Sequence, residues 1–333
     1  MDSAALIRSA RLWLYGNLTR PLTMSLVKLA AAGVKRYSLD DEAFELFRQR
    51  GFYLLREHFY LPIPDAAELS DQFWYAQSEL VGLDMNDGGA LEFLDNVFPR
   101  YNEEFRKTFQ IHAVPGSEAF HLINGSFMAV DAHAYYALIR HFKPKRIIEI
   151  GAGNSTMVAS AACEQNLKDG DALQLTAIDP FPKPLLKAGM PHLSRLVEDK
   201  VQSVPLELFT SLEDGDILFI DSTHVLREGG DVKFEYCEIL PRLASGVMVH
   251  IHDISLPKPY PRVYFEKKRF YWNEQYLLQA FLAFNSRFEV IWPGNYMMTK
   301  YPERVSEVFP EYHAMREAYP MSEPSSFWMR VKA

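Results

Sequence analysis

The pattern of apolar and polar positions along the chain changes near residue 143. From there, short apolar runs rich in β-branched residues alternate with longer stretches whose apolar positions repeat at helical spacing. We predict strands at 145–150, 173–178, 216–220 and 247–251. We predict helices at 155–166, 229–240 and 272–285. This alternation is typical of an α/β fold: a doubly wound, Rossmann-like and mostly parallel sheet with helices on both faces.

The first third of the chain has a different, mainly helical pattern. Residues 40–57 and 66–110 favour helices, whereas two prolines two positions apart make 58–65 an extended, aromatic-rich segment. We therefore divide the chain into a helical N-terminal extension, residues 1–115, and a domain that contains the sheet, residues 116–333.

Residues 1–36 combine an apolar face with an excess of basic side chains. Leucines recur at roughly helical spacing, and six basic residues stand against Asp2 alone, which gives a net charge of +5. Pro21 should break or kink the helix. Two interpretations stay open: a helix that packs on the protein with a solvated basic side, or a segment that lies on an anionic membrane surface or a partner.

Composition narrows the class of protein. A chain of 333 residues with 48% hydrophobic residues can bury a large core, and 14% aromatic residues argue against disorder. The net charge of −8 argues against nucleic acid as the main partner. The two cysteines fall in helix-like patterns, so we expect reduced thiols in a cytoplasmic protein. We also expect neither a secretory signal nor a transmembrane helix.

The first predicted strand ends in a glycine-containing turn, "EIGAGNST" (149–156). Gly151 and Gly153 allow a tight turn and close approach of a ligand to the backbone. Thr156 stands where a dinucleotide fingerprint has Gly or Ala, and Glu149 suits a cationic amino-acid group better than a pyrophosphate. The second strand ends at Asp179, whose carboxylate can accept hydrogen bonds from both hydroxyls of a ribose.

Acidic and imidazole side chains end the later strands. Asp221 and His224 follow 216–220, and His252 and Asp253 follow 247–251. Because the carboxyl ends of parallel strands share one edge of a sheet, these four side chains should lie in the same crevice. If the last strand is regular to its end, His252 lies on one face and Asp253 on the other.

These segments together resemble a known family. "RIIEIGAGNST", "IDP", "ILFIDSTH" and "VHIHDI" are similar to the class I S-adenosylmethionine-dependent methyltransferases, and more narrowly to the bacterial Methyltransf_24 family. The resemblance covers about residues 58–292. It implies that Glu149, Gly151 and Gly153 line the methionine part of S-adenosylmethionine, that Asp179 holds the ribose, that Gln202 or Ser203 lies near the adenine, and that Asp221 lies beside the methyl group and the substrate.

Three roles remain open for the Asp/His cluster. It could bind a divalent metal through Asp221, His224, His252 and Asp253, and the imidazoles would favour Zn²⁺, Fe²⁺ or Mn²⁺ over Mg²⁺. Without a metal, His224 or His252 could act as a general base held by Asp221 or Asp253. The third role is structural, with His–Asp hydrogen bonds that close the strand ends.

We expect an S-adenosylmethionine-dependent O-methyltransferase that acts on a small molecule or a glycan, because the cluster suits removal of a proton from a weak acid. Two alternatives are a nicotinamide-dependent dehydrogenase and a non-catalytic module that docks on a membrane or partner. The protein would be cytoplasmic, with peripheral contact to the inner face of the membrane through residues 1–36 if the second interpretation of that segment holds. The helical N-terminal third offers surface for a homodimer.

Overall fold

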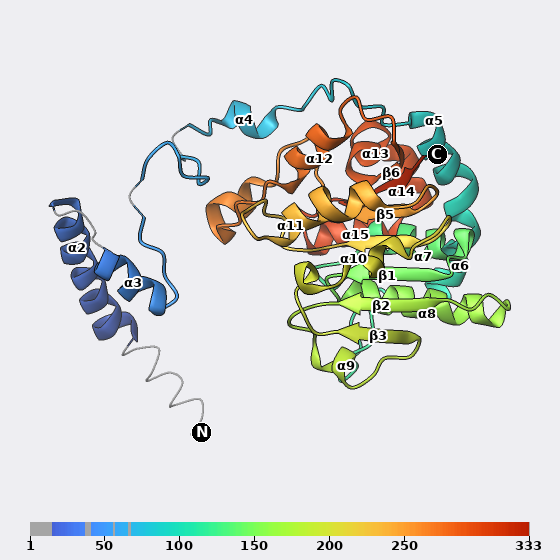
Figure 1. Ribbon diagram of the computed structural model, residues 1–333, viewed down its shortest axis with the longest axis horizontal. Coiled ribbons are helices and arrows are strands. Elements are labelled where there is room, and N and C mark those ends of the chain that lie inside the picture. Colours follow the sequence, from blue (N-terminus) through green and yellow to red (C-terminus); the bar gives the residue numbers. More distant parts are fainter. Residues whose placement is uncertain (1–14, 37–40, 56, 66–67, 333) are drawn as a thin grey trace. The chain divides into compact units, whose positions relative to one another are not determined.

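The structure of the protein is a computed structural model that describes residues 15–36, 41–55, 57–65 and 68–332 (Figure 1). By their contacts, residues 1–63 form one compact unit and residues 64–333 a second one. Residues 64–115 thus group with the second unit. The boundary between residues 115 and 116 stays a prediction.

The described helices of the first unit are followed by turns and irregular chain over residues 50–55 and 57–63. They are η1 (Tyr15–Thr19), α2 (Arg20–Arg36) and α3 (Asp41–Gln49). Pro21 is the second residue of α2 and lies where the π-helix η1 passes directly into α2, so the predicted irregularity falls at this junction. The leucines at 22, 26 and 29 are exposed within this unit. The membrane interpretation of residues 1–36 stays a prediction, and residues 1–14 of that segment lie outside the described residues.

Within the described ranges, no helix is both long enough and apolar enough to cross a bilayer.

The second unit is built on one sheet of seven strands. They are β1 (Arg146–Ile150), β2 (Gln174–Ile178), β3 (Leu193–Val197), β4 (Ile217–Ile220), β5 (Met248–Ile251), β6 (Phe288–Pro293) and β7 (Phe327–Val331). Their order is β3-β2-β1-β4-β5-β7-β6, and only β7 runs antiparallel to its neighbours. The predicted α/β class and the four predicted strands are confirmed. The sequence patterns did not predict β3, β6 or β7.

Helices cover both faces of this sheet, as Figure 1 shows. Before and between the first strands lie α4 (Asp71–Tyr75), α5 (Asp87–Glu92), η2 (Phe93–Val97), α6 (Phe98–Thr108), α7 (Asp131–Phe142), α8 (Asn154–Lys168), α9 (Pro184–Lys187), η3 (Val201–Ser203) and α10 (Leu206–Thr210). After β4 come α11 (Asp231–Phe234), η4 (Glu235–Ile239), η5 (Leu240–Arg242), η6 (Tyr264–Lys268), α12 (Glu274–Leu282), α13 (Gly294–Lys300), α14 (Pro302–Val308) and α15 (Glu311–Ala318). The three predicted helices correspond to α8, to α11 through η5, and to α12.

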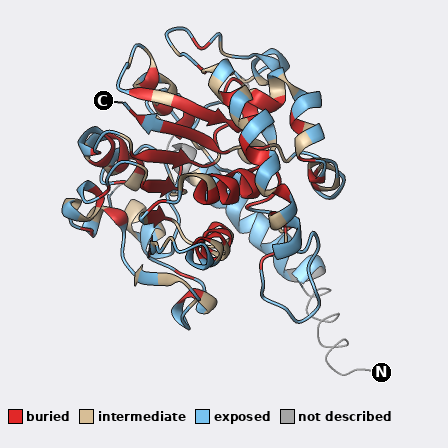
Figure 2. Ribbon diagram, turned by 90° about the vertical axis from the view of Figure 1, so that its right-hand side faces the viewer, coloured by how far each residue is buried: buried red, intermediate tan, exposed pale blue. Residues whose placement is uncertain are grey.

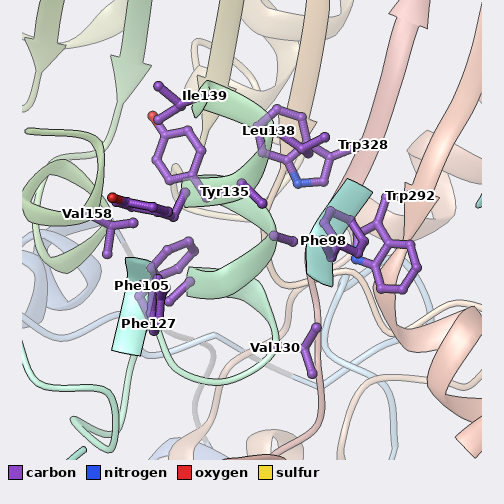
Figure 3. Close-up of a cluster of buried hydrophobic side chains, with 14 of the residues drawn as sticks. Phe98, Phe105, Phe127, Val130, Tyr135, Leu138, Ile139, Val158, Trp292 and Trp328 are labelled. Atoms are coloured by element: carbon purple, nitrogen blue, oxygen red, sulfur yellow. The ribbon is translucent and has the colours of Figure 1, made fainter. Parts of the chain in front are cut away.

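Alternate residues of the central strands pack into two separate cores. Ile147 and Phe219 face one core, whereas Ile148 and Leu218 face the other, so the strands are buried on both faces (Figure 2). Figure 3 shows how Tyr135 and Leu138 of α7 lie in the first core among side chains from several elements. This packing fixes α7, and with it the polar residue at its first position, Asp131.

The hydrogen-bond ladder continues one residue beyond several strands and aligns the residues that follow them. Gly151 N donates to Ile178 O at 2.9 Å, and Asp221 N donates to Ile150 O at 2.8 Å. His252 N donates to Ile220 O at 2.9 Å. The chain order reverses between β1 and β4, and ligands of open α/β sheets bind at such a point, outside the carboxyl ends of the strands.

Candidate active site

A cavity of about 470 Å³ opens at the carboxyl ends of β1, β2 and β4, and we call it the strand-end cavity. Four residues predicted to contact the cofactor line it: Gly151, Asp179, Gln202 and Asp221. The structure therefore brings these four predicted residues together at one edge of the sheet.

Gly151 lies close to the backbone of Asp221. Its φ is +81°, and a Cβ at this position would lie 1.9 Å from the carbonyl oxygen of Asp221. A side chain is thus excluded by both conformation and space. A Cβ on Gly153 would come no nearer than 3.9 Å, to Lys183 Nζ. The predicted need for glycine at 153 is therefore not set by packing within the chain.

Asp179 is fixed by two backbone amides. Its Oδ2 accepts from Ala152 N at 3.0 Å, and its Oδ1 accepts from Phe181 N at 2.7 Å. Each carboxylate oxygen can accept a further hydrogen bond, so the group remains able to bind two hydroxyls. Gln202 Nε2 donates to Gly229 O at 2.9 Å, which holds the η3 turn against the loop before α11.

Glu149 does not line the strand-end cavity. It is fully buried at the end of β1, where burial raises the pKa of its carboxyl to about 8 while the Ser155 and Thr156 side chains oppose that rise. The expected contact of Glu149 with the methionine part of the cofactor stays a prediction.

Four side chains meet beside this cavity and form what we call the strand-end cluster: Asp221, His224, His252 and Asp253. His224 Nε2 lies 3.3 Å from Asp221 Oδ1 and 3.4 Å from Asp253 Oδ2. His252 Nδ1 lies 3.5 Å from Asp221 Oδ1 and 3.8 Å from Asp253 Oδ1. Each imidazole thus faces both carboxylates.

The cluster closes because the backbone leaves the strand conformation. Asp253 has a φ of +56°, and His224 has a φ of +60°. The expected placement of Asp253 on the face opposite to His252 does not hold, because β5 ends at Ile251 and the chain then turns. Non-glycine residues adopt this conformation at a cost, and such strained positions gather at functional sites.

His252 is oriented from behind by a second carboxylate. Its Nε2 lies 3.5 Å from Asp131 Oδ2 and 3.4 Å from Ser325 Oγ. Its Nδ1 is buried and makes no hydrogen bond to any described residue. A carboxylate near one ring nitrogen, with no hydrogen bond at the other, is the arrangement found around metal-ligating histidines.

Three of the four predicted metal ligands can converge on one ion. Asp221, His252 and Asp253 each offer a ligand atom, and these atoms lie within 4.8 Å of one another. His224, the fourth predicted ligand, is not in this group. Its Nδ1 lies 2.9 Å from Glu274 Oε2, so carboxylates face both nitrogens of its ring.

The carboxylates control the charge of both histidines. Burial alone would lower the pKa of His224, but the Asp221 and Glu274 carboxylates raise it well above its ordinary value. Burial likewise opposes a charge on His252, and the nearby charges of Asp221 and Asp253 raise its pKa. Carboxylates face both ring nitrogens of His224, and its role as a metal ligand stays a prediction.

A second cavity, of about 490 Å³, reaches the cluster from the other side of the site, and we call it the loop-walled cavity. Asp253, Asp131 and Ser325 line it, together with residues of α4 and of the segment 255–264. Asp221 lines the strand-end cavity, so the cluster stands where the two cavities meet.

Several residues of the site were predicted only loosely, or not at all. Asp131 lines the loop-walled cavity and faces His252, whereas Glu274 faces His224. Ser325 and Phe181 were not predicted. Ser325 has no sequence signal, because it reaches His252 from 73 residues away. Phe181 follows "IDP" directly, and its ring lines the strand-end cavity and is 86% exposed, so its face is open to a ligand.

The comparisons with known proteins agree with this geometry. A family model described as a methyltransferase domain, Methyltransf_24, matches residues 148–254, which run from β1 to just beyond Asp253. An uncharacterized protein of Archaeoglobus fulgidus is 29% identical over 170 residues, which make up 48% of this chain and 74% of that protein.

Two solved structures resemble parts of this chain. The apo-structure of CmcI-N160 is 12% identical, with coverage of 62% of this chain and 72% of that chain and a TM-score of 0.31. The plantazolicin methyltransferase BpumL, in complex with a monoazolic desmethylPZN analogue and SAH, is 11% identical, with coverage of 60% and 83% and a TM-score of 0.35. Both TM-scores lie below 0.5, so these two likenesses support no functional conclusion.

The family match favours the methyltransferase interpretation over a nicotinamide-dependent dehydrogenase, and it spans every strand end that carries the cluster. It also confirms the resemblance found in the motifs. Residues 148–254 thus match the model of the Methyltransf_24 methyltransferase domain, in agreement with the resemblance to the S-adenosylmethionine-dependent methyltransferases.

Proposed function

We propose that the protein transfers the methyl group of S-adenosylmethionine to a hydroxyl oxygen of its acceptor. One observation carries this proposal: Asp221 lines one cavity, Asp253 lines the other, and both carboxylates face the same two imidazoles. A donor in the strand-end cavity and an acceptor in the loop-walled cavity would therefore meet at groups that can remove a proton.

The residues of the strand-end cavity fit S-adenosylmethionine. Asp179 would accept from the ribose hydroxyls, Gln202 lies on the wall expected near the adenine, and Gly151 leaves backbone space for the methionine part. The exposed ring of Phe181 offers a face for the adenine to stack on. When bound, the cofactor supplies an electrophilic methyl group on a sulfonium ion.

The strand-end cluster also fits a divalent metal. Asp221, His252 and Asp253 would hold it, and the unbonded Nδ1 of buried His252 is the observation that supports this. Two carboxylates and one imidazole suit Mn²⁺, Fe²⁺ or Zn²⁺ better than Mg²⁺. A bound metal would lower the pKa of a coordinated hydroxyl and orient it.

The chain's own groups complete the reaction. The acceptor hydroxyl gives its proton to the strand-end cluster or through it to water, and its oxygen forms a bond to the methyl carbon. The bond between that carbon and sulfur breaks, and S-adenosylhomocysteine leaves as a neutral thioether. Transfer to oxygen is favoured because a hydroxyl is a weak acid, and the carboxylates and imidazoles are placed to take its proton.

A metal-free route uses the same residues. In that route His252, held by Asp131, or His224, held by Glu274, would take the proton as a general base. The two routes differ in one measurable respect, namely whether the site binds a metal ion.

Calorimetric titration of the full chain with S-adenosylmethionine tests the proposal. The protein is first treated with a chelator and then supplied with Mg²⁺, Mn²⁺, Fe²⁺ or Zn²⁺. We expect cofactor binding that Asp179→Ala weakens strongly, and a separate heat signal on addition of metal that Asp253→Asn removes. The exposed Asp171, which pairs with Lys143 far from the cavity, gives a matched control in Asp171→Ala.

The outcomes separate the alternatives. Cofactor binding without any metal signal supports the metal-free base. Equal binding by Asp179→Ala and Asp171→Ala would remove the strand-end cavity as the cofactor site, and absence of binding under every condition contradicts the methyltransferase proposal.

A further inference from the structure

The loop-walled cavity is large enough to hold a small-molecule ring, and its lining side chains indicate which kind. It has a volume of about 490 Å³ and ends at Asp253, one of the residues of the strand-end cluster. If the function proposed above holds, this cavity receives the acceptor, so the inference that follows rests on that function.

One wall of the cavity is aromatic. Trp74 and Tyr75 of α4 line it together with Tyr260 and Tyr264 of the segment after β5. Trp74 packs against Phe265 with ring centroids 6.1 Å apart, and Tyr264 packs edge-on against Trp272 at 4.9 Å. Aromatic faces carry partial negative charge, which attracts the weakly positive C–H bonds of a saturated ring that carries oxygen.

Another wall is polar and offers both donors and acceptors. Glu323 accepts from Lys258 Nζ at 2.7 Å and from Asn295 Nδ2 at 3.1 Å. Ser255 and Ser325 line the same cavity. Gln275 is buried and holds the backbone of this segment, since it accepts from Ser255 N at 2.9 Å and donates to Lys258 O at 3.1 Å. Neighbouring hydroxyls of a ligand would find a partner of either kind here.

The two cations of the cavity are already paired. Lys258 pairs with Glu323, and Arg262 pairs with Asp71 at 2.6 Å and with Glu266 at 2.7 Å. A carboxylate or phosphate on the ligand would have to displace these partners, and it would also meet the carboxylate of Asp253. The charge pattern therefore favours a ligand without net charge.

We infer that the loop-walled cavity binds a neutral glycosyl ring, with the ring C–H bonds on the aromatic wall, hydroxyls on the polar wall, and one hydroxyl directed toward Asp253 as the methyl acceptor. A flat phenol fits the aromatic wall alone. It leaves Asn295, which is only 4% exposed, and Glu323 without new partners, and the loss of water from such groups is costly when no hydrogen bond replaces it.

Saturation-transfer NMR on the full chain tests this inference without a need for turnover. The probes are methyl glycosides of neutral hexoses and 6-deoxyhexoses, a methyl glucuronoside and 4-methylcatechol, followed by an array of neutral and acidic glycans. We expect binding of at least one neutral glycoside, with a dissociation constant at least 10-fold lower than for its uronate counterpart.

Two variants address the aromatic wall, and one serves as their control. We expect Trp74→Ala and Tyr264→Ala to weaken glycoside binding at least fivefold. We expect Phe284→Ala, which removes an exposed ring outside both this cavity and the strand-end cavity, to leave it unchanged. Binding of S-adenosylhomocysteine, measured by calorimetry, reports on the strand-end cavity and stays constant in all three.

The inference is overturned if the uronoside or 4-methylcatechol binds more tightly than every neutral glycoside. It is also overturned if neither the probes nor the array shows a neutral sugar, or if both wall variants bind like Phe284→Ala. Any of these results together with intact cofactor binding rejects the sugar site alone, whereas loss of cofactor binding by the wild-type chain rejects the proposed function itself.

Discussion

The two cavities that meet at the strand-end cluster are built in different ways. The strand-end cavity takes its main residues from the ends of β1, β2 and β4 and from the short segments that follow them, and backbone contacts fix them. The walls of the loop-walled cavity come from α4, from the segment after β5 and from the residues before β7. Side-chain pairs such as Arg262–Asp71 hold those segments together.

Because of this difference, we expect the two cavities to respond differently when side chains are replaced. Backbone geometry at strand ends depends on the ladder of the sheet, so it changes little when a side chain is replaced. Walls made of side chains on loops change shape and charge with each replacement. We therefore expect the strand-end cavity to define the donor and the loop-walled cavity to define the acceptor.

Asp221→Asn should have the largest effect, because Asp221 lines one cavity and belongs to the cluster that borders the other. Asn keeps the size of the side chain but removes the charge that faces both imidazoles. We expect a fall in methyl transfer of about 10³-fold, measured as S-adenosylhomocysteine formed per enzyme. Asp95→Asn, at an exposed pair with Arg304, is the control. If both variants form S-adenosylhomocysteine at similar rates, the strand-end cluster takes no part in catalysis.

Gly151→Ala should break the strand-end cavity alone. The new Cβ would lie 1.9 Å from Asp221 O at a φ of +81°, so either the turn after β1 or the Asp221 backbone must move. We expect a loss of about 3 kcal/mol in the free energy of unfolding, at the upper end for single replacements, measured by chemical denaturation. Gly116 has nearly the same φ, +80°, but open space around it.

Gly116→Ala therefore reports the cost of the conformation without the clash. We expect that cost to be about 1 kcal/mol. If the two variants are destabilised equally, the close approach between Gly151 and Asp221 does not constrain the fold.

Asp131→Asn should weaken the interaction that orients His252, while the size of the side chain and the shape of both cavities stay the same. Asp131 accepts from Ser325 N at 2.9 Å and Ser326 N at 3.0 Å and faces His252 Nε2. Loss of its charge leaves the imidazole less well oriented, and metal affinity should fall by about 10- to 100-fold. Calorimetric titration with Mn²⁺ measures it, and cofactor affinity should not change. Unaltered metal affinity would limit Asp131 to a structural role.

Phe181→Ala should have the smallest effect, and it should be confined to the donor side. The ring is 86% exposed and lines the strand-end cavity, so its removal costs little stability. We expect a loss of about 1 kcal/mol in cofactor binding if the adenine stacks on it. Binding of a methyl glycoside in the same variant should remain as in the wild type. Unchanged cofactor affinity would show that the adenine lies elsewhere.

The contrast between the cavities also explains how far the sequence could be interpreted. Gly151, Asp179 and Asp221 each follow a β-branched run directly, so a local pattern was enough to place them at one edge of the sheet. The strand β7 was missed because "FWMRV" lies outside the βα alternation and pairs in the antiparallel sense between β5 and β6. Its position depends on tertiary pairing rather than on local spacing.

The polar partners of the histidines show the same limit. His224 and His252 were predicted from their strand ends. Their partners lie far away in the sequence: Glu274 is 50 residues from His224, and Asp131, the partner of His252, comes before β1. A local pattern cannot assign such a pair. It also cannot show that Asp253 turns back toward His252, because the φ of +56° depends on the loop that follows.

The place of β7 in the sheet has a consequence for the order in which the site matures during synthesis. Ser325 and Ser326 precede β7 directly, and their amides bind Asp131, which in turn faces His252. The ribosome makes nearly all other residues of the site before these two. A nascent chain can therefore form the parallel strands β1 to β5 and still lack the contacts that orient His252. A chain that ended shortly before residue 325 would lack both β7 and the two amides that hold Asp131 behind His252.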